Sequence, residues 1–472
     1  MAYSHPFAQR LRLLLLVASC AASVASPALA TEKPNIVYVI ADDMGWKDVG
    51  FHGGRARTPN LDRLALGGAM LNAFYVQQTS SQSRAAAITG RYPMRYGLQT
   101  GTLTATSSYC LPEDERTMGN ALKEVGYRTA FIGKWQLGHA KPECLPTRRG
   151  FDSFYGPLTH PKDYLIKKGT KVDWRQNDKP IKVEGEVTGL IAKAAAAHLR
   201  QVDSGSPFFL LVSFTAPAAP FGADKMHLDA YPEIEDADLK RYLAAITRLD
   251  QTIGEMLIVL EQRKLIGNTL IIFHSDSGAA LPVKFPTADA DVAAQVGDND
   301  VFREGRGSLY EGGLRVPALM YWSGKFPAGN IVYDPVHVTD VVATLFAMVG
   351  ASPHPKKKLD GLDLSAALSG KARSPRKEIL LNVEDFHGAL RVGEFKLIVH
   401  SALPTKLELF HIPNDPEETD NIAEREPERT RALLKRLNDY AYDMMPALQV
   451  EEWSAARGDS SMLLWRTNPP RR

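Results

Sequence analysis

Short runs of apolar, mostly β-branched residues recur along the first two thirds of the chain and predict buried strands. They span residues 35–41, 127–132, 208–214 and 269–273. Such continuous runs are typical of strands covered on both faces. Helical patterns precede the last three runs, and in the clearest of them, from Leu239 to Leu260, apolar residues recur every three, four or seven positions. The alternation predicts an α/β fold with a large, mostly parallel sheet flanked by helices.

The pattern changes after about residue 375. Short apolar runs suited to antiparallel strands occupy residues 379–383, 388–392 and 394–399, and a helical pattern spans Pro427 to Met444. A proline in the first turn of a helix costs no hydrogen bond. We therefore expect a large α/β domain over residues 31–375 and a small C-terminal α+β subdomain, with helix and tail, over residues 376–472.

The N-terminus has the pattern of a secretory signal peptide over residues 1–30. Arg10 and Arg12 precede an apolar stretch that ends in Ala28-Leu29-Ala30, the order of a charged region, an apolar region and a cleavage site. The protein is therefore expected to be exported, to the periplasm or the medium, after cleavage near Ala30. In an alternative interpretation Val17 to Cys20 is a lipobox and Cys20 is lipidated. No other stretch is apolar for long enough to span a membrane.

The charge balance and the cysteine content bear on the protein's partners and on disulfide formation. Lys and Arg number 56 and Asp and Glu 54, and this balance gives no reason to expect a nucleic-acid partner. No pattern indicates an oligomeric state. Of three cysteines, Cys110 and Cys144 remain after removal of a signal peptide, and an oxidising compartment favours their pairing, the alternative being two separate buried thiols.

Charged residues follow several of the predicted strands. Asp42 and Asp43 follow the first, Lys134 the second and Asp276 the fourth. Ligands of such sheets gather at the carboxyl ends of the strands. A cluster of carboxylates there suits Ca²⁺ or Mg²⁺ better than zinc, although a strand-end Asp-Asp pair also serves as a helix cap or turn.

Collinear motifs over nearly the whole chain carry a family resemblance. They include NIVYVIADDMGWKDVGFHGG, TPNLDRLALGG, SRAAAITGRYP, GYRTAFIGKWQLGH, ECLPTRRGFDSFYG, SDSG, GSLYEGGLRVP and FHIPNDPEETDNIA. The sequence resembles the sulfatases of the alkaline-phosphatase superfamily, most of all the arylsulfatase B-type group. The resemblance implies an alkaline-phosphatase-like fold, a small-molecule or glycan sulfate ester as substrate, and a disulfide between Cys110 and Cys144.

The resemblance also assigns a nucleophile. The family signature is Cys or Ser, any residue, Pro, Ser, Arg, and its first residue is oxidised to formylglycine. Alignment on Ser83 and Arg84 places Ser80 there. A hydrated aldehyde has one oxygen to attack sulfur and a second to expel sulfate. An unmodified serine lacks the second oxygen, although it precedes a predicted helix whose free N–H groups favour a bound anion.

Further roles carry over residue by residue. Asp42, Asp43 and Asp276 match ligands of a Ca²⁺ or Mg²⁺ ion, and Ser277 stands at the position of a fourth ligand, Asn or Gln. Arg84 matches the residue that supports the nucleophile. The remaining matched catalytic positions are those of Lys134, Gln136 and Arg306.

Five positions depart from the family pattern. Gln82 replaces Pro or Ala, Gln136 and Ala218 replace histidines, Ser277 replaces the amide ligand, and Arg306 replaces a lysine. Glutamine cannot transfer a proton at neutral pH, and arginine is a poor acid.

Three hypotheses follow from these departures. The protein hydrolyses sulfate esters, or it binds an anionic ligand without turnover, or an unmodified Ser80 attacks phosphate or phosphonate esters. His52 and His139 are candidates to replace the missing histidines, and residues 155–190 and 279–303 are expected to shape the pocket.

Overall fold

The computed structural model describes residues 33–203, 205–281, 296–401 and 404–457. The predicted signal peptide, with the alternative lipidation of Cys20, lies outside the described residues. Within the described residues no helix is both long and apolar enough to cross a bilayer. The domain boundary after residue 375 stays a prediction.

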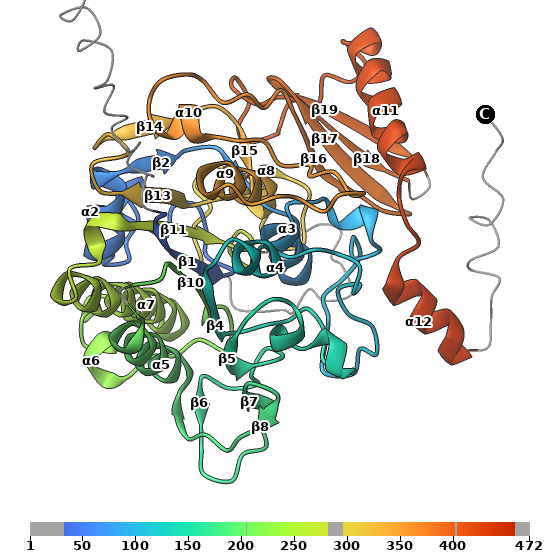
Figure 1. Cartoon of the computed structure of the whole chain (residues 1–472). Coiled ribbons are helices and arrows are strands. Elements are labelled where there is room, and N and C mark those ends of the chain that lie inside the picture. The colour runs from blue at the N-terminus through green and yellow to red at the C-terminus, as the bar shows by residue number, and fades with distance from the viewer. Residues whose placement is uncertain (1–32, 204, 282–295, 402–403, 458–472) are drawn as a thin grey trace, which may run out of the picture. The chain divides into compact units, whose positions relative to one another are not determined.

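A ten-stranded sheet forms the centre of the fold (Figure 1). Its strands, in spatial order, are β14 (Asn330–Val332), β2 (Ala69–Leu71), β13 (Ala318–Trp322), β11 (Thr269–Ser275), β1 (Asn35–Asp42), β10 (Phe208–Pro217), β4 (Arg128–Gly133), β5 (Ser153–Pro157), β7 (Trp174–Gln176) and β8 (Lys179–Pro180). The five strands from β11 to β5 run parallel, and four of them are the strands that the apolar runs predicted. Both edges add antiparallel pairs, so the whole sheet is mixed.

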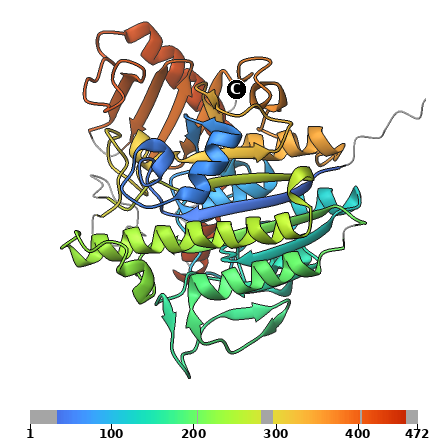
Figure 2. The same cartoon turned by 90° about the vertical axis from the view of Figure 1, so that its left-hand side faces the viewer.

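Side chains alternate between two cores along β1. Tyr38 packs with α3 (Ser80–Thr89), α4 (Met118–Glu124) and α9 (Thr339–Val349) on one face. Val39 packs with α5 (Val187–Gln201) and α7 (Ala237–Gln262) on the other. Figure 2 shows α7 running along its face of the sheet. Because both faces are covered, the strand is apolar from Ile36 to Ala41, just before Asp42.

The helix predicted around residues 239–260 is confirmed as α7. It begins at Ala237 because the Asp236 carboxylate accepts hydrogen bonds from the N–H groups of Asp238 and Leu239, which satisfies two free donors of the first turn. The disulfide between Cys110 and Cys144 is likewise present.

A second, four-stranded antiparallel sheet follows in the C-terminal part. Its strands pair in chain order: β16 (Glu378–Val383), β17 (His387–Val392), β18 (Phe395–His400) and β19 (Lys406–His411). Helix α11 (Pro427–Tyr442) covers it through Leu433 and Leu437. The sequence predicted the first three strands and the helix but not β19. A buried Lys396 binds Glu311 at 3.0 Å and Glu418 at 2.8 Å and so ties this sheet to α8 (Glu311–Leu314).

Candidate active site

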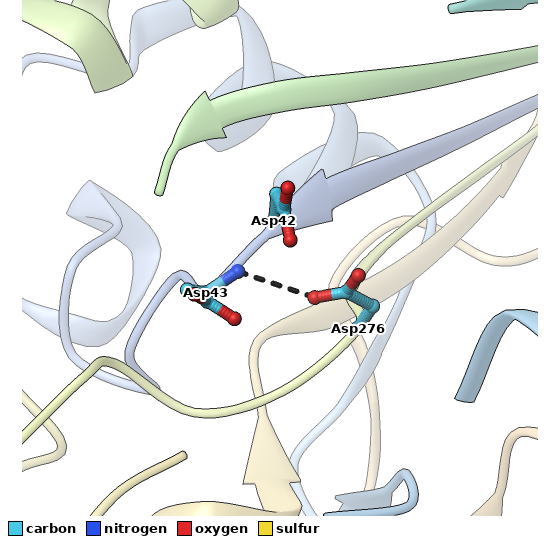
Figure 3. A group of neighbouring side chains, drawn as sticks. All are labelled: Asp42, Asp43 and Asp276. Atoms are coloured by element: carbon cyan, nitrogen blue, oxygen red, sulfur yellow. Dashed lines mark hydrogen bonds between the residues drawn. The ribbon is translucent and has the colours of Figure 1, made fainter. Parts of the chain in front are cut away.

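Three buried carboxylates meet at the carboxyl ends of two neighbouring strands. Asp42 ends β1, Asp43 follows it, and Asp276 comes directly after β11. One oxygen from each lies within 4.8 Å of the others. The Asp43 N–H donates to Asp276 Oδ1 at 3.2 Å (Figure 3). Parallel pairing of β1 with β11 therefore brings together residues more than 200 positions apart in the sequence.

The turn after β1 orients the side chain of Asp43 within this cluster. Asp43 has a φ of +58°, a left-handed conformation that Asp tolerates better than most residues. Its Oδ1 accepts a hydrogen bond from Ser277 Oγ at 2.6 Å. Ser277 thus lies at the cluster and bonds to one of its carboxylates, while its role as a metal ligand stays a prediction.

Three cations surround the three carboxylates. Lys134 Nζ lies 2.5 Å from Asp42 Oδ2, Arg84 Nη2 lies 2.8 Å from Asp276 Oδ2, and Arg306 Nε lies 3.1 Å from Asp43 Oδ1. The cluster is therefore close to neutral. A divalent cation would leave it with an excess of positive charge, which suits an anionic ligand.

Burial and the neighbouring charges shift the pKa values of Asp42 and Asp276 in opposite directions. Burial would raise the pKa of Asp42, but Lys134, His160 and Arg84 together hold it well below its usual value. Burial raises the pKa of Asp276 to about 7, and the Asp42 charge adds to the effect. Burial also lowers the pKa of the Lys134 ammonium against the pull of Asp42.

The cluster fits a hard divalent cation. All three donors are carboxylates, which Ca²⁺ and Mg²⁺ prefer. Asp276 Oδ2 is buried and, within the described part of the chain, accepts no well-aligned hydrogen bond, although it forms an ion pair with Arg84 Nη2 at 2.8 Å. A buried oxygen without a hydrogen bond is costly, and a cation bound by the cluster would remove that cost.

Ser80 is the hydroxyl of its segment that faces the cluster. It is the first residue of α3, and its Oγ donates to Asp42 Oδ1 at 3.1 Å. The neighbouring hydroxyls serve the local fold: Thr79 donates to the Gly101 carbonyl, Ser81 to that of Gln136 and Ser83 to that of Gln77. Position at a helix N-terminus and contact with a carboxylate together single out Ser80 as the candidate nucleophile.

The two glutamines at altered positions lie in different places. Gln82 is fully buried, and its amide donates to the Gln99 carbonyl. Gln136 lines the cleft, and its amide donates to the Leu103 carbonyl at 3.4 Å. Its Oε1 is buried and accepts no hydrogen bond from the residues that the structure describes.

An open cleft of about 800 Å³ leads to the cluster. Its described lining comprises Asp42, Asp43, Thr102, Leu103, Thr104, Ala105, Thr106, Lys134, Gln136, Thr159, His160, Pro161, Lys162, Ala218, Ala219, Pro220, Ala280 and Arg306. Ser80, Arg84 and Asp276 are buried beside Asp42 rather than in the lining. Residues 159–162 and Ala280 belong to the two segments predicted to shape the pocket, of which residues 282–295 lie outside the described part.

The sequence did not single out His160, a histidine that the structure places at the site. Its Nδ1 lies 3.2 Å from Asp42 Oδ2 and its Nε2 2.9 Å from the Ala219 carbonyl oxygen. It follows β5, whose carboxyl end adjoins that of β4, and that position after a parallel strand was the available signal.

The two histidines named from the sequence have other partners. His52 stacks on Trp46 with a ring separation of 3.7 Å and bonds to the Trp46 carbonyl. His139 Nε2 lies 3.2 Å from the Ala105 carbonyl oxygen. Neither belongs to the described lining of the cleft.

Comparison with known proteins defines the class. The sulfatase family model matches residues 34–351, and the model described as N-sulphoglucosamine sulphohydrolase, C-terminal, matches residues 304–444. The chain therefore belongs to the sulfatase family, whose members are sulfuric ester hydrolases. The fold is the alkaline-phosphatase-like one that the resemblance implied.

Individual relatives agree with this assignment. The chain is 29% identical to arylsulfatase J of Mus musculus, over 88% of this chain and 77% of that protein. It is 33% identical to N-acetylgalactosamine-6-sulfatase of Canis lupus familiaris, over 82% of this chain and 74% of that protein. The solved structure of Ps i-CgsB in complex with k-i-k-neocarrahexaose matches with a TM-score of 0.80 and 28% identity, covering 88% of this chain and 94% of that one.

Proposed function

We propose that the protein hydrolyses sulfate esters of carbohydrates at the cleft above the carboxylate cluster. The observation that carries the proposal is the convergence of the Ser80 hydroxyl and the Lys134 ammonium on one carboxylate, that of Asp42. A nucleophile, a cation and a carboxylate cluster thus lie within contact distance, with Asp42 and Lys134 in the lining of the cleft and Ser80 buried behind Asp42. The relatives named for sulfated sugars, and the neighbour solved with a neocarrahexaose, support a carbohydrate substrate.

The lining of the cleft also supports a sugar substrate. Thr102, Thr104, Thr106 and Thr159 contribute hydroxyl groups to it. Hydroxyls that both donate and accept hydrogen bonds suit a ligand with many hydroxyls. A volume of about 800 Å³ is at the upper end for small-molecule sites, which suits more than one sugar ring.

Each charged residue has a proposed part in the chemistry. A divalent cation held by Asp42, Asp43 and Asp276 would polarise the sulfate group and the nucleophile. Lys134 and Arg306 line the cleft and stabilise negative charge as the ester bond breaks. Arg84 holds two of the carboxylates in place through its ion pairs.

We further propose that Ser80 is oxidised to formylglycine, whose hydrated aldehyde supplies two hydroxyls. An unmodified serine would be left as its own sulfate ester after attack, because it has no second oxygen with which to release sulfate. Gln82 does not obstruct this nucleophile in the folded state, since its amide bonds to the Gln99 carbonyl and not to Ser80.

Measuring sulfate release distinguishes a sulfate-ester hydrolase from a protein that only binds the sulfated ligand. Release of inorganic sulfate from sulfated monosaccharides and from 4-nitrophenyl sulfate should depend on Ca²⁺ and disappear in Ser80→Ala. The altered residues Gln136 and Ala218 favour a second candidate, a protein that binds the sulfated ligand without cleaving it. Binding of the sulfated sugar with no sulfate released, by protein that carries the aldehyde, would establish the rival and refute the proposal.

A further inference from the structure

The ring of His160 is fixed between two parts of the cleft. Its Nε2 lies 2.9 Å from the Ala219 carbonyl oxygen and its Nδ1 lies 3.2 Å from Asp42 Oδ2. Both partners are acceptors, and a ring that donates to both carries a proton on each nitrogen. The side chain keeps 27% of its surface exposed, and that surface lines the cleft.

As far as the structure describes it, the wall beside this ring has no polar side chain. Ala218, Ala219 and Pro220 form it, and these side chains can neither donate to nor accept from a ligand. His160 is the only histidine among the described residues that line the cleft. Ala218 and His160 also line a small neighbouring void together, so the imidazole of residue 160 lies against the backbone that carries residue 218.

Asp42 Oδ2 is placed to accept two hydrogen bonds. The bond from the Lys134 ammonium measures 2.5 Å, and the bond from His160 Nδ1 measures 3.2 Å and is therefore the weaker of the two. If His160 Nδ1 gave its hydrogen bond to a ligand instead of Asp42, the Asp42 carboxylate would still accept the hydrogen bond from Lys134. The Nε2 bond to Ala219 would continue to hold the ring, so little conformational entropy would be lost on binding.

We propose that His160 Nδ1–H donates a hydrogen bond to an oxygen of the bound sulfate ester and so supplies, from the loop after β5, the imidazole that residue 218 lacks. The inference rests on the proposed function, because it places the sulfate group beside Asp42. It assigns His160 as a substrate-contacting residue rather than a support for the 218–220 wall. It follows that an imidazole carried by residue 218 should replace the one carried by residue 160.

An exchange of the two positions tests this assignment. The variants are His160→Ala, His160→Gln, which keeps a side-chain donor, and the double variant His160→Ala with Ala218→His. His139→Ala is the matched control, because it removes an imidazole that lies 3.2 Å from the cleft residue Ala105. Each is compared with the wild type in kcat/KM on 4-nitrophenyl sulfate, in the affinity for inorganic sulfate by calorimetry, and in thermal unfolding.

The expected loss in His160→Ala is about 10- to 100-fold in kcat/KM and in sulfate affinity, the usual worth of a hydrogen bond to a charged group. His160→Gln should lose less, the exchanged double variant should recover most of the loss, and His139→Ala should match the wild type. Unchanged kinetics and affinity in His160→Ala overturn the proposal. So does an exchanged variant that unfolds like the wild type but remains as impaired as His160→Ala.

The affinity for inorganic sulfate tests the role of His160 even if the protein cleaves no ester. If the wild type binds sulfate but cleaves no ester, the proposed function fails, while the affinity series still decides the role of His160. If the wild type cleaves esters and His160→Ala does so equally well, the proposed function stands and the assignment of His160 fails.

Discussion

Neutralising Asp276 should have opposite effects on stability and on metal binding. The side chain is fully buried, and burial together with the Asp42 charge raises its pKa from 3.8 to about 7. A carboxyl with a raised pKa stabilises the fold fully at pH values below its ordinary pKa, and this stability is lost as the pH rises through 7. A shift of three units corresponds to about 4 kcal/mol.

The Asp276→Asn variant removes the free-energy cost of ionising a buried carboxyl group in the folded protein. Without divalent cations at pH 8 its free energy of unfolding should exceed that of the wild type by up to about 4 kcal/mol, less whatever the lost ion pair with Arg84 contributed. At pH 4 the two proteins should be alike. Calcium should stabilise the wild type by about 2.7 kcal/mol at one hundred times its Kd, and the variant much less, because it keeps only two of the three carboxylates.

Urea unfolding followed by tryptophan fluorescence measures both effects, at pH 4 and pH 8, with EDTA or with Ca²⁺. Asp48→Asn is the matched control. Asp48 is also buried, its pKa is raised to about 7 by burial, and it bonds to Tyr242 and the Gly45 N–H outside the cluster. The control should gain stability at pH 8 and keep the full calcium increment. An equal calcium increment in Asp276→Asn and the wild type would refute the assignment of the metal site.

Three further changes give separate expectations. Lys134→Gln removes the cation 2.5 Å from Asp42 and should lower kcat/KM for sulfate esters by about 10²- to 10³-fold, as measured by sulfate release. Lys396→Met takes from the buried Glu418 the cation at 2.8 Å and from Glu311 its nearest cation, although Arg315 and Arg391 stay within 4.0 Å of Glu311. It should cost about 3–5 kcal/mol in urea unfolding. Serine at both Cys110 and Cys144 opens a loop with a sequence separation of 34 and should cost about 4 kcal/mol in the same assay.

Each of these expectations has a result that would contradict it. Lys123→Gln removes a surface lysine bound to Asp152 and should leave kcat/KM unchanged, so an equal loss in both lysine variants would deny Lys134 a specific role. A Lys396→Met protein as stable as the wild type would show that the buried cluster is not a net stabilising tie. Equal stability with and without the disulfide would contradict the loop-entropy reasoning.

The central strands could be predicted because burial on both faces leaves a simple pattern. The centres of β1, β10 and β11 are continuous apolar runs, as is typical of parallel strands covered by helices on both faces. The edge strands β8 and β14 have two and three residues. Segments so short have no period to detect. β14 is a strand only through its long-range pairing with β2, and β8 only through the tight hairpin turn that joins it to β7.

The same contrast holds at the site. Asp42, Asp43 and Asp276 could be predicted to meet because they end neighbouring parallel strands. His160 was missed because the strand before it, β5, was not among the predicted apolar runs, and because its contact with Asp42 depends on how the loop after β5 folds. Nor does the sequence show that the side chain of Gln82 is buried and bonded to a backbone carbonyl.

Mass spectrometry of the tryptic peptide Leu64–Arg84, from protein purified from its native host, tests directly whether Ser80 is oxidised to formylglycine. We expect residue 80 to have lost two hydrogens, the mass change of that oxidation. A peptide with the mass of unmodified serine throughout would contradict the proposed nucleophile.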